Sequence, residues 1–222
     1  MPGRTIPLVT GEIYHIFNRG INKQPTFTNK KEYKRALNTI QFYRYVKPPM
    51  SLSKFLKLED KKQNDIIDVL KQRKKLVEIY CFCFMPNHFH FLVRQREDKG
   101  ISIFLSNLQN SYTKFFNTKH NRDGSLFSDQ FKAVRIETDE QLTHVSRYIH
   151  LNPYTGYVVK SLEELENYYW SSFPEYLKAS GQFIDIYFVL SFFKNQKEYK
   201  QFIYDQADYQ RELKEIEHLM FE

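Results

Sequence analysis

The sequence predicts an α+β fold: a ferredoxin-like, split βαβ antiparallel sheet with helices packed on one face, and a peripheral helical extension at the C-terminal end. Segments typical of strands and helices follow one another in the order strand, helix, insertion, strand, strand, helix, strand, helix. The 222 residues are 41% hydrophobic and 17% aromatic, which is enough for a packed core. This length suits one large domain with an appendage and argues against a two-domain enzyme with a cofactor-binding fold.

The first strand and the first helix have clear boundaries. Residues 13–17 predict a strand, and residues 18–22 form a polar turn after it. Asn29 and Glu32 form a capping box at the start of a helix, which the proline pair at 48–49 terminates.

Residues 48–76 predict a basic insertion between that helix and the next strand. They are rich in lysine, and their few apolar side chains recur at roughly helical spacing. We therefore expect two short helices here.

A hairpin of two buried strands is predicted next. Residues 77–85 are β-branched and aromatic, the pair Pro86-Asn87 interrupts this pattern, and residues 88–94 resume it. After Gly100, apolar side chains recur at helical spacing as far as Phe116, which predicts a long amphipathic helix.

The last strand and helix of the body follow a polar loop. Residues 131–136 predict the strand, and Thr138 with Gln141 forms a capping box for a helix that ends at Pro153. Residues 1–160 are therefore the predicted main domain, and residues 161–222 a mostly helical, acidic extension.

Charge is distributed unevenly between these two parts. Residues 1–160 carry 27 Lys and Arg against 14 Asp and Glu, whereas residues 161–222 carry 6 against 12. A basic body is typical of a nucleic-acid-binding protein, because Lys and Arg near phosphates release condensed counterions. Some of the 20 Phe and 16 Tyr side chains could also stack on unpaired bases. A merely solubilising surface is the alternative explanation.

The sequence favours a cytoplasmic protein. It contains no run of about 18 apolar residues, and residues 1–11 lack the apolar core of a signal peptide. The two cysteines, Cys81 and Cys83, are two residues apart and are expected to be reduced thiols. Neither secretion nor a membrane partner is therefore expected.

His88 and His90 are the first candidate site residues. Because side chains alternate along a strand, both imidazoles lie on one face while Phe89 points to the other. Such a pair can provide half of a metal site, although two structural histidines would give the same pattern.

Tyr148 and Asn152 lie four residues apart on the last predicted helix of the body, and hence on one face of it. The amide oxygen of Asn152 could complete a His, His, Asn set whose mixed nitrogen and oxygen donors suit Mg²⁺ or Mn²⁺. Tyr148 would then lie beside a phosphate bound at that site.

Four motifs lie along residues 13 to about 159. They are Tyr14-His15-Ile16-Phe17-Asn18-Arg19-Gly20, Met85-Pro86-Asn87-His88-Phe89-His90-Phe91-Leu92-Val93, Ser111-Tyr112-Thr113-Lys114-Phe115-Phe116-Asn117 and Arg147-Tyr148-Ile149-His150-Leu151-Asn152-Pro153. In order and spacing these motifs resemble those of the single-tyrosine HUH transposases, and most closely the REP-associated tyrosine transposases within the IS200-like transposase family. The later Trp170-Ser171-Ser172 is also similar to a family motif.

The resemblance implies a specific chemistry. By position, His88, His90 and Asn152 would hold a divalent metal, and Tyr148 would attack DNA to give a 5′-phosphotyrosine and a free 3′-OH. The implied substrate is single-stranded or hairpin DNA, which the enzyme would cleave and rejoin as a monomer or a homodimer.

Several alternatives remain open. Tyr112 is a rival nucleophile, although its spacing places it on the apolar stripe of its helix. Cys81 and Cys83 could form a zinc site with the two histidines if the hairpin register brings both pairs to one face. A domesticated, non-catalytic DNA- or RNA-binding protein is the alternative function. Candidate phosphate contacts are Arg19, Lys132 and Arg135.

Overall fold

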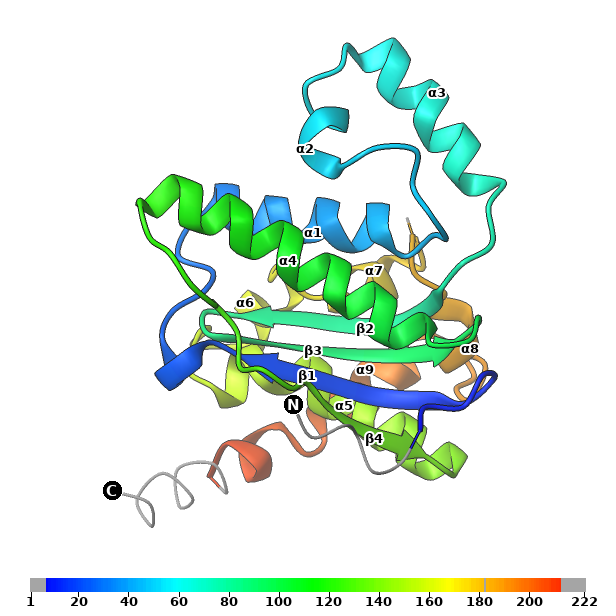
Figure 1. Ribbon diagram of the computed structural model, residues 1–222. Coiled ribbons are helices and arrows are strands. Elements are labelled where there is room, and N and C mark those ends of the chain that lie inside the picture. Colours follow the sequence, from blue (N-terminus) through cyan, green and yellow to red (C-terminus); the bar gives the residue numbers. More distant parts are fainter. Residues whose placement is uncertain (1–6, 182, 213–222) are drawn as a thin grey trace.

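A four-stranded antiparallel sheet lies at the centre of the protein (Figure 1). The structure is a computed structural model that describes residues 7–181 and 183–212. The strand order is β2-β3-β1-β4, and every neighbouring pair is antiparallel. The strands are β1 (Ile13–Arg19), β2 (Val77–Met85), β3 (His88–Gln95) and β4 (Lys132–Ile136). The predicted α+β class and split βαβ arrangement are confirmed.

Two long helices cover one face of this sheet, as predicted. They are α1 (Lys30–Tyr43) and α4 (Gly100–His120), which pack against each other (Figure 1). Phe91 of β3 contacts Phe104 of α4 on this face, with ring centroids 5.9 Å apart. The capping box at Asn29 is present, since its side chain accepts a hydrogen bond from the Glu32 amide.

The opposite face is covered by α5 (Asp139–Thr155), so the sheet has helices on both sides (Figure 1). The physical reason lies in β3, where every side chain but two is buried. Phe89 and Phe91 need cover on one side, and His90 and Leu92 need it on the other. The prediction that the helices pack on one face therefore holds for α1 and α4 and does not include α5.

Over residues 161–181 and 183–212 the C-terminal extension is mostly helical, as expected, but it packs more closely than a peripheral segment. Its chain runs along the outer edge of β2: the Phe84 amide donates to the Trp170 carbonyl at 2.8 Å, and the Ser172 amide donates to the Phe82 carbonyl at 2.9 Å. Fully buried side chains such as Phe173 join the main core. The helices are α6 (Leu162–Glu166), α7 (Phe173–Lys178), α8 (Ile186–Leu190) and α9 (Gln196–Tyr204).

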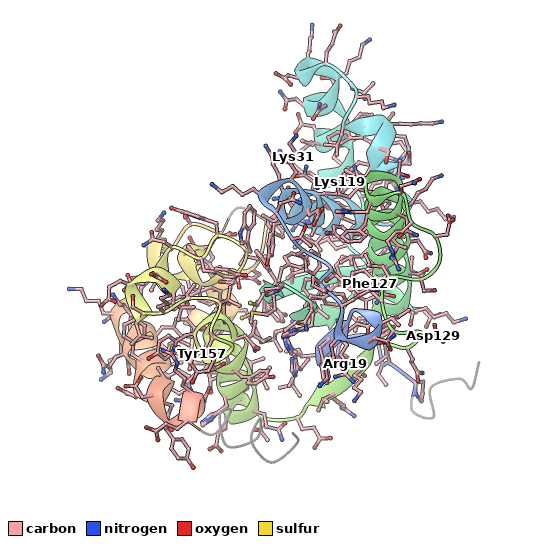
Figure 2. All side chains as sticks on the ribbon, turned by 90° about the vertical axis from the view of Figure 1, so that its left-hand side faces the viewer. Arg19, Lys31, Lys119, Phe127, Asp129 and Tyr157 are labelled. Atoms are coloured by element: carbon pink, nitrogen blue, oxygen red, sulfur yellow. The ribbon has the colours of Figure 1, made fainter. Side chains whose placement is uncertain are left out.

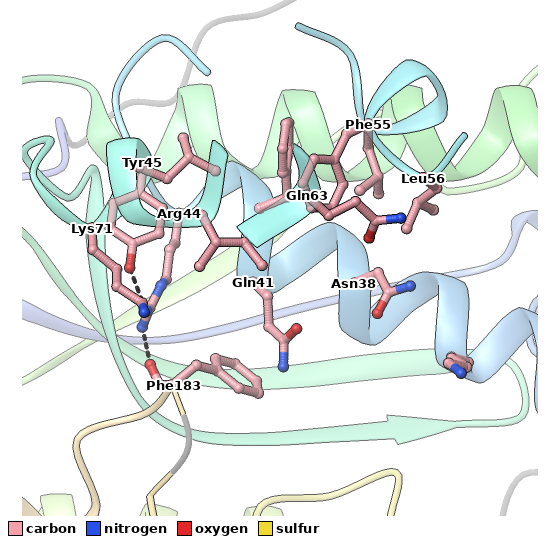
Figure 3. Close-up of a pocket in the computed structure, with 14 residues that line it drawn as sticks. Asn38, Gln41, Arg44, Tyr45, Phe55, Leu56, Gln63, Lys71 and Phe183 are labelled. Carbon is pink, nitrogen blue, oxygen red and sulfur yellow. Dashed lines mark hydrogen bonds between the residues drawn. The ribbon is translucent and has the colours of Figure 1, made fainter. Parts of the chain in front are cut away.

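The basic insertion forms two helices, α2 (Leu52–Phe55) and α3 (Asp60–Lys71), above α1 (Figure 1). It has its own small hydrophobic cluster, composed of Phe42, Tyr45, Leu52, Phe55 and Leu70. A cavity of about 500 Å³ lies between the insertion and α1 (Figure 3).

Two other short features complete the fold. A 3-10 helix (Ile21–Lys23) follows β1. Gly100, at the start of α4, touches the chain before β2: a Cβ there would lie 2.2 Å from the Leu76 carbonyl oxygen, so only glycine fits. Within the described residues, no helix is long and apolar enough to cross a membrane.

Candidate active site

The two histidines of β3 point to the α5 face of the sheet. His88 and His90 are perpendicular neighbours, with ring centroids 5.1 Å apart. The Nδ1 atom of His88 is 2.6 Å from the Oδ1 atom of Asn87, while Nδ2 of Asn87 donates to the Lys23 carbonyl. Because the amide is fixed in this way, its oxygen accepts a hydrogen bond from Nδ1 of His88, and in the neutral ring the lone pair is then on Nε2, where it can bind a cation.

His15 of β1 is a third imidazole at this site, and the sequence analysis gave it no role. Its Nε2 atom is 3.0 Å from Nδ1 of His90, and the two rings stack at 5.2 Å. Burial lowers the pKa of His15 to about 4, so its ring is neutral at pH 7. Alternation along β1 could have placed His15 on one face, but only the register with β3 shows which imidazole it meets.

Tyr148 lies over these rings from α5. Its ring meets His90 edge-on at 5.4 Å and 88°, and His15 at 5.7 Å and 72°. The side chain is nevertheless 40% exposed. It thus contacts the histidines on one side and solvent on the other, which is what a nucleophile acting on a macromolecular substrate requires.

Asn152 lies one turn after Tyr148 and is buried. Its Nδ2 atom donates to the Tyr148 carbonyl at 3.0 Å, so the nitrogen end of the amide faces its own helix. The oxygen is therefore the end of the amide that can bind a cation.

Tyr112, the rival nucleophile, is in the core on the opposite face of the sheet. It is fully buried among Phe27, Phe116 and Phe127, and its hydroxyl donates to the Thr26 carbonyl at 2.6 Å. Burial raises the pKa of its phenol far above the usual value. Neither access nor ionisation favours nucleophilic attack by Tyr112.

The hairpin register places Cys83 opposite His90 and Cys81 opposite Leu92. Cys81 is buried against the Tyr176 hydroxyl at 3.3 Å, and burial raises the pKa of its thiol to about 12. Among the described residues, no group of three or more His, Cys, Asp and Glu side chains is arranged to hold a metal ion. The zinc hypothesis therefore has no support from the geometry.

Two of the three candidate phosphate contacts lie beside the site. Arg19 is exposed (Figure 2), and it lies opposite His88 in the pairing of β1 with β3. Lys132 of β4 lies opposite Phe17 in the pairing of β1 with β4. Directly opposed residues share a face of the sheet, so both cations border the histidines. Arg135 pairs with Tyr14 and so points to the other face, where it forms an ion pair with Glu12 at 3.0 Å.

A comparison with known families identifies the family of this chain. Residues 9–152, more than half of the chain, match the family described as "Transposase IS200 like". The chain belongs to this family. The match includes every histidine of the site and ends at Asn152, so the resemblance seen in the sequence motifs is confirmed.

A solved structure shares the fold of this IS200-like transposase. It is described as a REP-associated tyrosine transposase bound to a REP hairpin, and it matches with a TM-score of 0.52 and 15% sequence identity. The alignment covers 83% of this chain and 94% of the other. No curated protein matches the chain.

Proposed function

We propose that this IS200-like transposase cleaves and rejoins single-stranded or hairpin DNA, with Tyr148 as the nucleophile. The observation that carries the proposal is the position of the Tyr148 ring, which is half-exposed and edge-on to His90. The tyrosine oxygen would form a bond to phosphorus while the bond from phosphorus to O3′ breaks. The phenol proton is lost and the 3′ oxygen gains one, leaving a 5′-phosphotyrosine and a 3′-OH. Because one phosphodiester replaces another, the step is reversible and the strands can be rejoined.

The donor set of the site fits a divalent cation. His88 and His90 are adjacent on β3, Nδ1 of His88 is directed at Asn87, and the nitrogen of the Asn152 amide is directed at the Tyr148 carbonyl. Nε2 of His88 and the oxygen of Asn152 are therefore the atoms that would bind a cation. Two imidazole nitrogens and one amide oxygen suit Mn²⁺ and also Mg²⁺. A bound cation supplies Lewis-acid polarisation of the scissile phosphate and offsets the charge that develops on it.

The protein's own side chains would hold the substrate beside Tyr148. Arg19 and Lys132 border the histidines and are exposed, so they can bind phosphates on either side of the scissile one. The solved relative is described as bound to a REP hairpin, which supports hairpin DNA as a substrate class. A single strand has unpaired bases and a flexible backbone that can enter a site between a helix and a sheet.

We also propose residues 1–160 as the catalytic unit, acting in the cytoplasm as a monomer or homodimer. The family match over residues 9–152 supports the first part. Residues 161–222 would then support the α5 helix rather than contribute to the chemistry.

The test is incubation of the full chain with end-labelled hairpin DNA and Mn²⁺ or Mg²⁺, followed by a denaturing gel and peptide mapping. The wild-type protein should give a covalent adduct at Tyr148 that EDTA prevents. Tyr148→Phe should abolish the adduct while DNA binding persists, and His88→Ala or His90→Ala should do the same without unfolding the protein.

Tyr112→Phe is the matched control, because it removes a phenol of the same size from the opposite face of the sheet. It should still form the adduct. An adduct at Tyr112, or cleavage without Tyr148, would contradict the assignment. DNA binding by the wild type without any adduct would instead favour a non-catalytic binding protein.

A further inference from the structure

We infer that His15 is a positioning residue that holds His90 with the proton on Nδ1, so that Nε2 of His90 faces the cation. The inference rests on the proposed function, in which His88 and His90 bind a divalent metal. The strand β1 would thereby contribute to the site as well as β3 and α5.

The contact between the two rings and the proposed cation together assign the tautomer. Nε2 of His15 lies 3.0 Å from Nδ1 of His90, which is a normal hydrogen-bond distance and leaves room for one proton between the nitrogens. Nδ1 of His90 faces His15, so a cation would be bound by Nε2 of His90, and a ligand nitrogen must carry a lone pair. The proton of a neutral His90 therefore lies on Nδ1 and is donated to His15.

His88 shows the same arrangement with a different acceptor. Its Nδ1 is 2.6 Å from the Asn87 oxygen, an atom that can only accept. Both histidines of the pair thus have Nδ1 directed at a partner from the protein. Metal-binding histidines are typically oriented by such a hydrogen bond from the other ring nitrogen.

The surroundings of His15 keep its ring in place. It is 9% exposed, stacks on His90, and meets the ring of Phe17 at 5.0 Å. The Tyr148 ring packs edge-on against His15, so a substitution of His15 would also change the surface on which the Tyr148 ring packs. The described residues contain no three His, Cys, Asp and Glu side chains arranged around one metal ion, which argues against His15 as a third ligand.

The first measurement is long-range ¹H–¹⁵N NMR of the imidazoles in the metal-free full chain. Wild-type His90 should carry its proton on Nδ1. In His15→Ala the signals of His90 should shift toward the Nε2–H form, because the acceptor for Nδ1 is gone. His144→Gln, a change of a histidine elsewhere on α5, is the control and should leave His90 unchanged.

The second measurement is Mn²⁺ affinity by electron paramagnetic resonance on the same proteins. His15→Ala should bind Mn²⁺ at least about 10-fold more weakly, the usual effect of losing such an orienting partner. His15→Gln should recover most of the affinity, since its amide oxygen can accept the Nδ1 proton. A merely structural role would give no such rescue.

The two proposals fail in different ways. A wild-type protein that does not bind Mn²⁺ contradicts the metal site itself, while the tautomer measurement still decides the role of His15. Unchanged Mn²⁺ affinity in His15→Ala, or a wild-type His90 with its proton on Nε2, overturns the inference about His15 and leaves the proposed function standing.

Discussion

Single residues carry both chemistry and stability in this protein, and Glu32 is the clearest stabilising one. Its carboxylate is fully buried and accepts hydrogen bonds from Lys119 at 2.6 Å and His120 at 2.7 Å, so it ties the start of α1 to the end of α4. Burial alone would raise the pKa of Glu32, but these bonds and those from Thr28 hold it at about 2.

Glu32→Gln should therefore lower the free energy of unfolding by about 2–3 kcal/mol at pH 7. Since the folded pKa lies below the usual 4.5, the advantage of the wild type is complete above about pH 5 and disappears as the pH falls toward 2. Urea unfolding at pH 7 and pH 3 measures it, with exposed Glu137→Gln as the control. An equal difference at both pH values would contradict this explanation.

Residue periodicity alone was enough to propose part of the candidate site. The alternation of His88 and His90 and the helical spacing of Tyr148 and Asn152 needed no tertiary information. His15 could not be found in this way, because its role depends on the pairing of β1 with β3. The same limit explains why Arg135 was proposed as a phosphate contact although it points to the opposite face of the sheet from His15.

At the scale of elements, α5 is held in place by a buried network of hydrogen bonds around His150. Nδ1 of His150 is 2.7 Å from the Tyr199 hydroxyl, and Nε2 is 2.7 Å from the Ser172 hydroxyl. Ser172 in turn accepts a hydrogen bond from the Phe82 amide of β2 at 2.9 Å. The Trp170-Ser171-Ser172 motif thus connects the helix of Tyr148 to the edge of the sheet.

Burial lowers the pKa of His150 to about 3, which makes stability sensitive to mild acid. The unfolded chain takes up a proton below about pH 6.5 and the folded one does not, so the free energy of unfolding falls as the pH decreases. Between pH 7 and pH 5 the decrease should be about 2 kcal/mol smaller in His150→Gln than in the wild type. Identical pH profiles would exclude His150 as the cause.

The extension is the element that the sequence described least well. Its helical content and acidic charge were evident, but its contacts with β2 were not, because local patterns do not show which strand edge is free. The Asp185 amide also donates to the Ile79 carbonyl at 2.9 Å, so the extension touches β2 along much of its length.

Removing residues 161–222 should therefore destabilise the whole fold. The edge of β2 and the apolar surface that Tyr176 and Tyr199 now cover would become exposed, which favours aggregation. Chain 1–160 should be recovered mainly as insoluble or aggregated protein, as measured by size-exclusion chromatography. A soluble, cooperatively folded 1–160 would show that the extension is dispensable.

For the whole molecule, the distribution of charge predicts how DNA binding depends on salt. Residues 1–160 carry 27 basic against 14 acidic residues, so the affinity for DNA should fall strongly as the salt concentration rises. We expect tighter binding to single-stranded or hairpin DNA than to blunt duplex, because exposed aromatic side chains can stack on unpaired bases and not on bases inside a duplex. Mobility-shift titrations at two salt concentrations test both statements. Equal affinity for duplex and no salt effect would contradict them.

The anchoring of α5 also bears on whether Tyr148 acts with the histidines of its own chain or with those of a second copy. Tyr148 contacts His15 and His90 of its own chain, and His150 on the same helix is held by Ser172 and Tyr199. Exchange of the helix between two copies would have to break those buried bonds. A mixture of Tyr148→Phe and His88→Ala proteins should therefore remain as inactive as either alone, since neither subunit can complement the other. Restored cleavage in the mixture would mean that catalytic parts are shared between molecules.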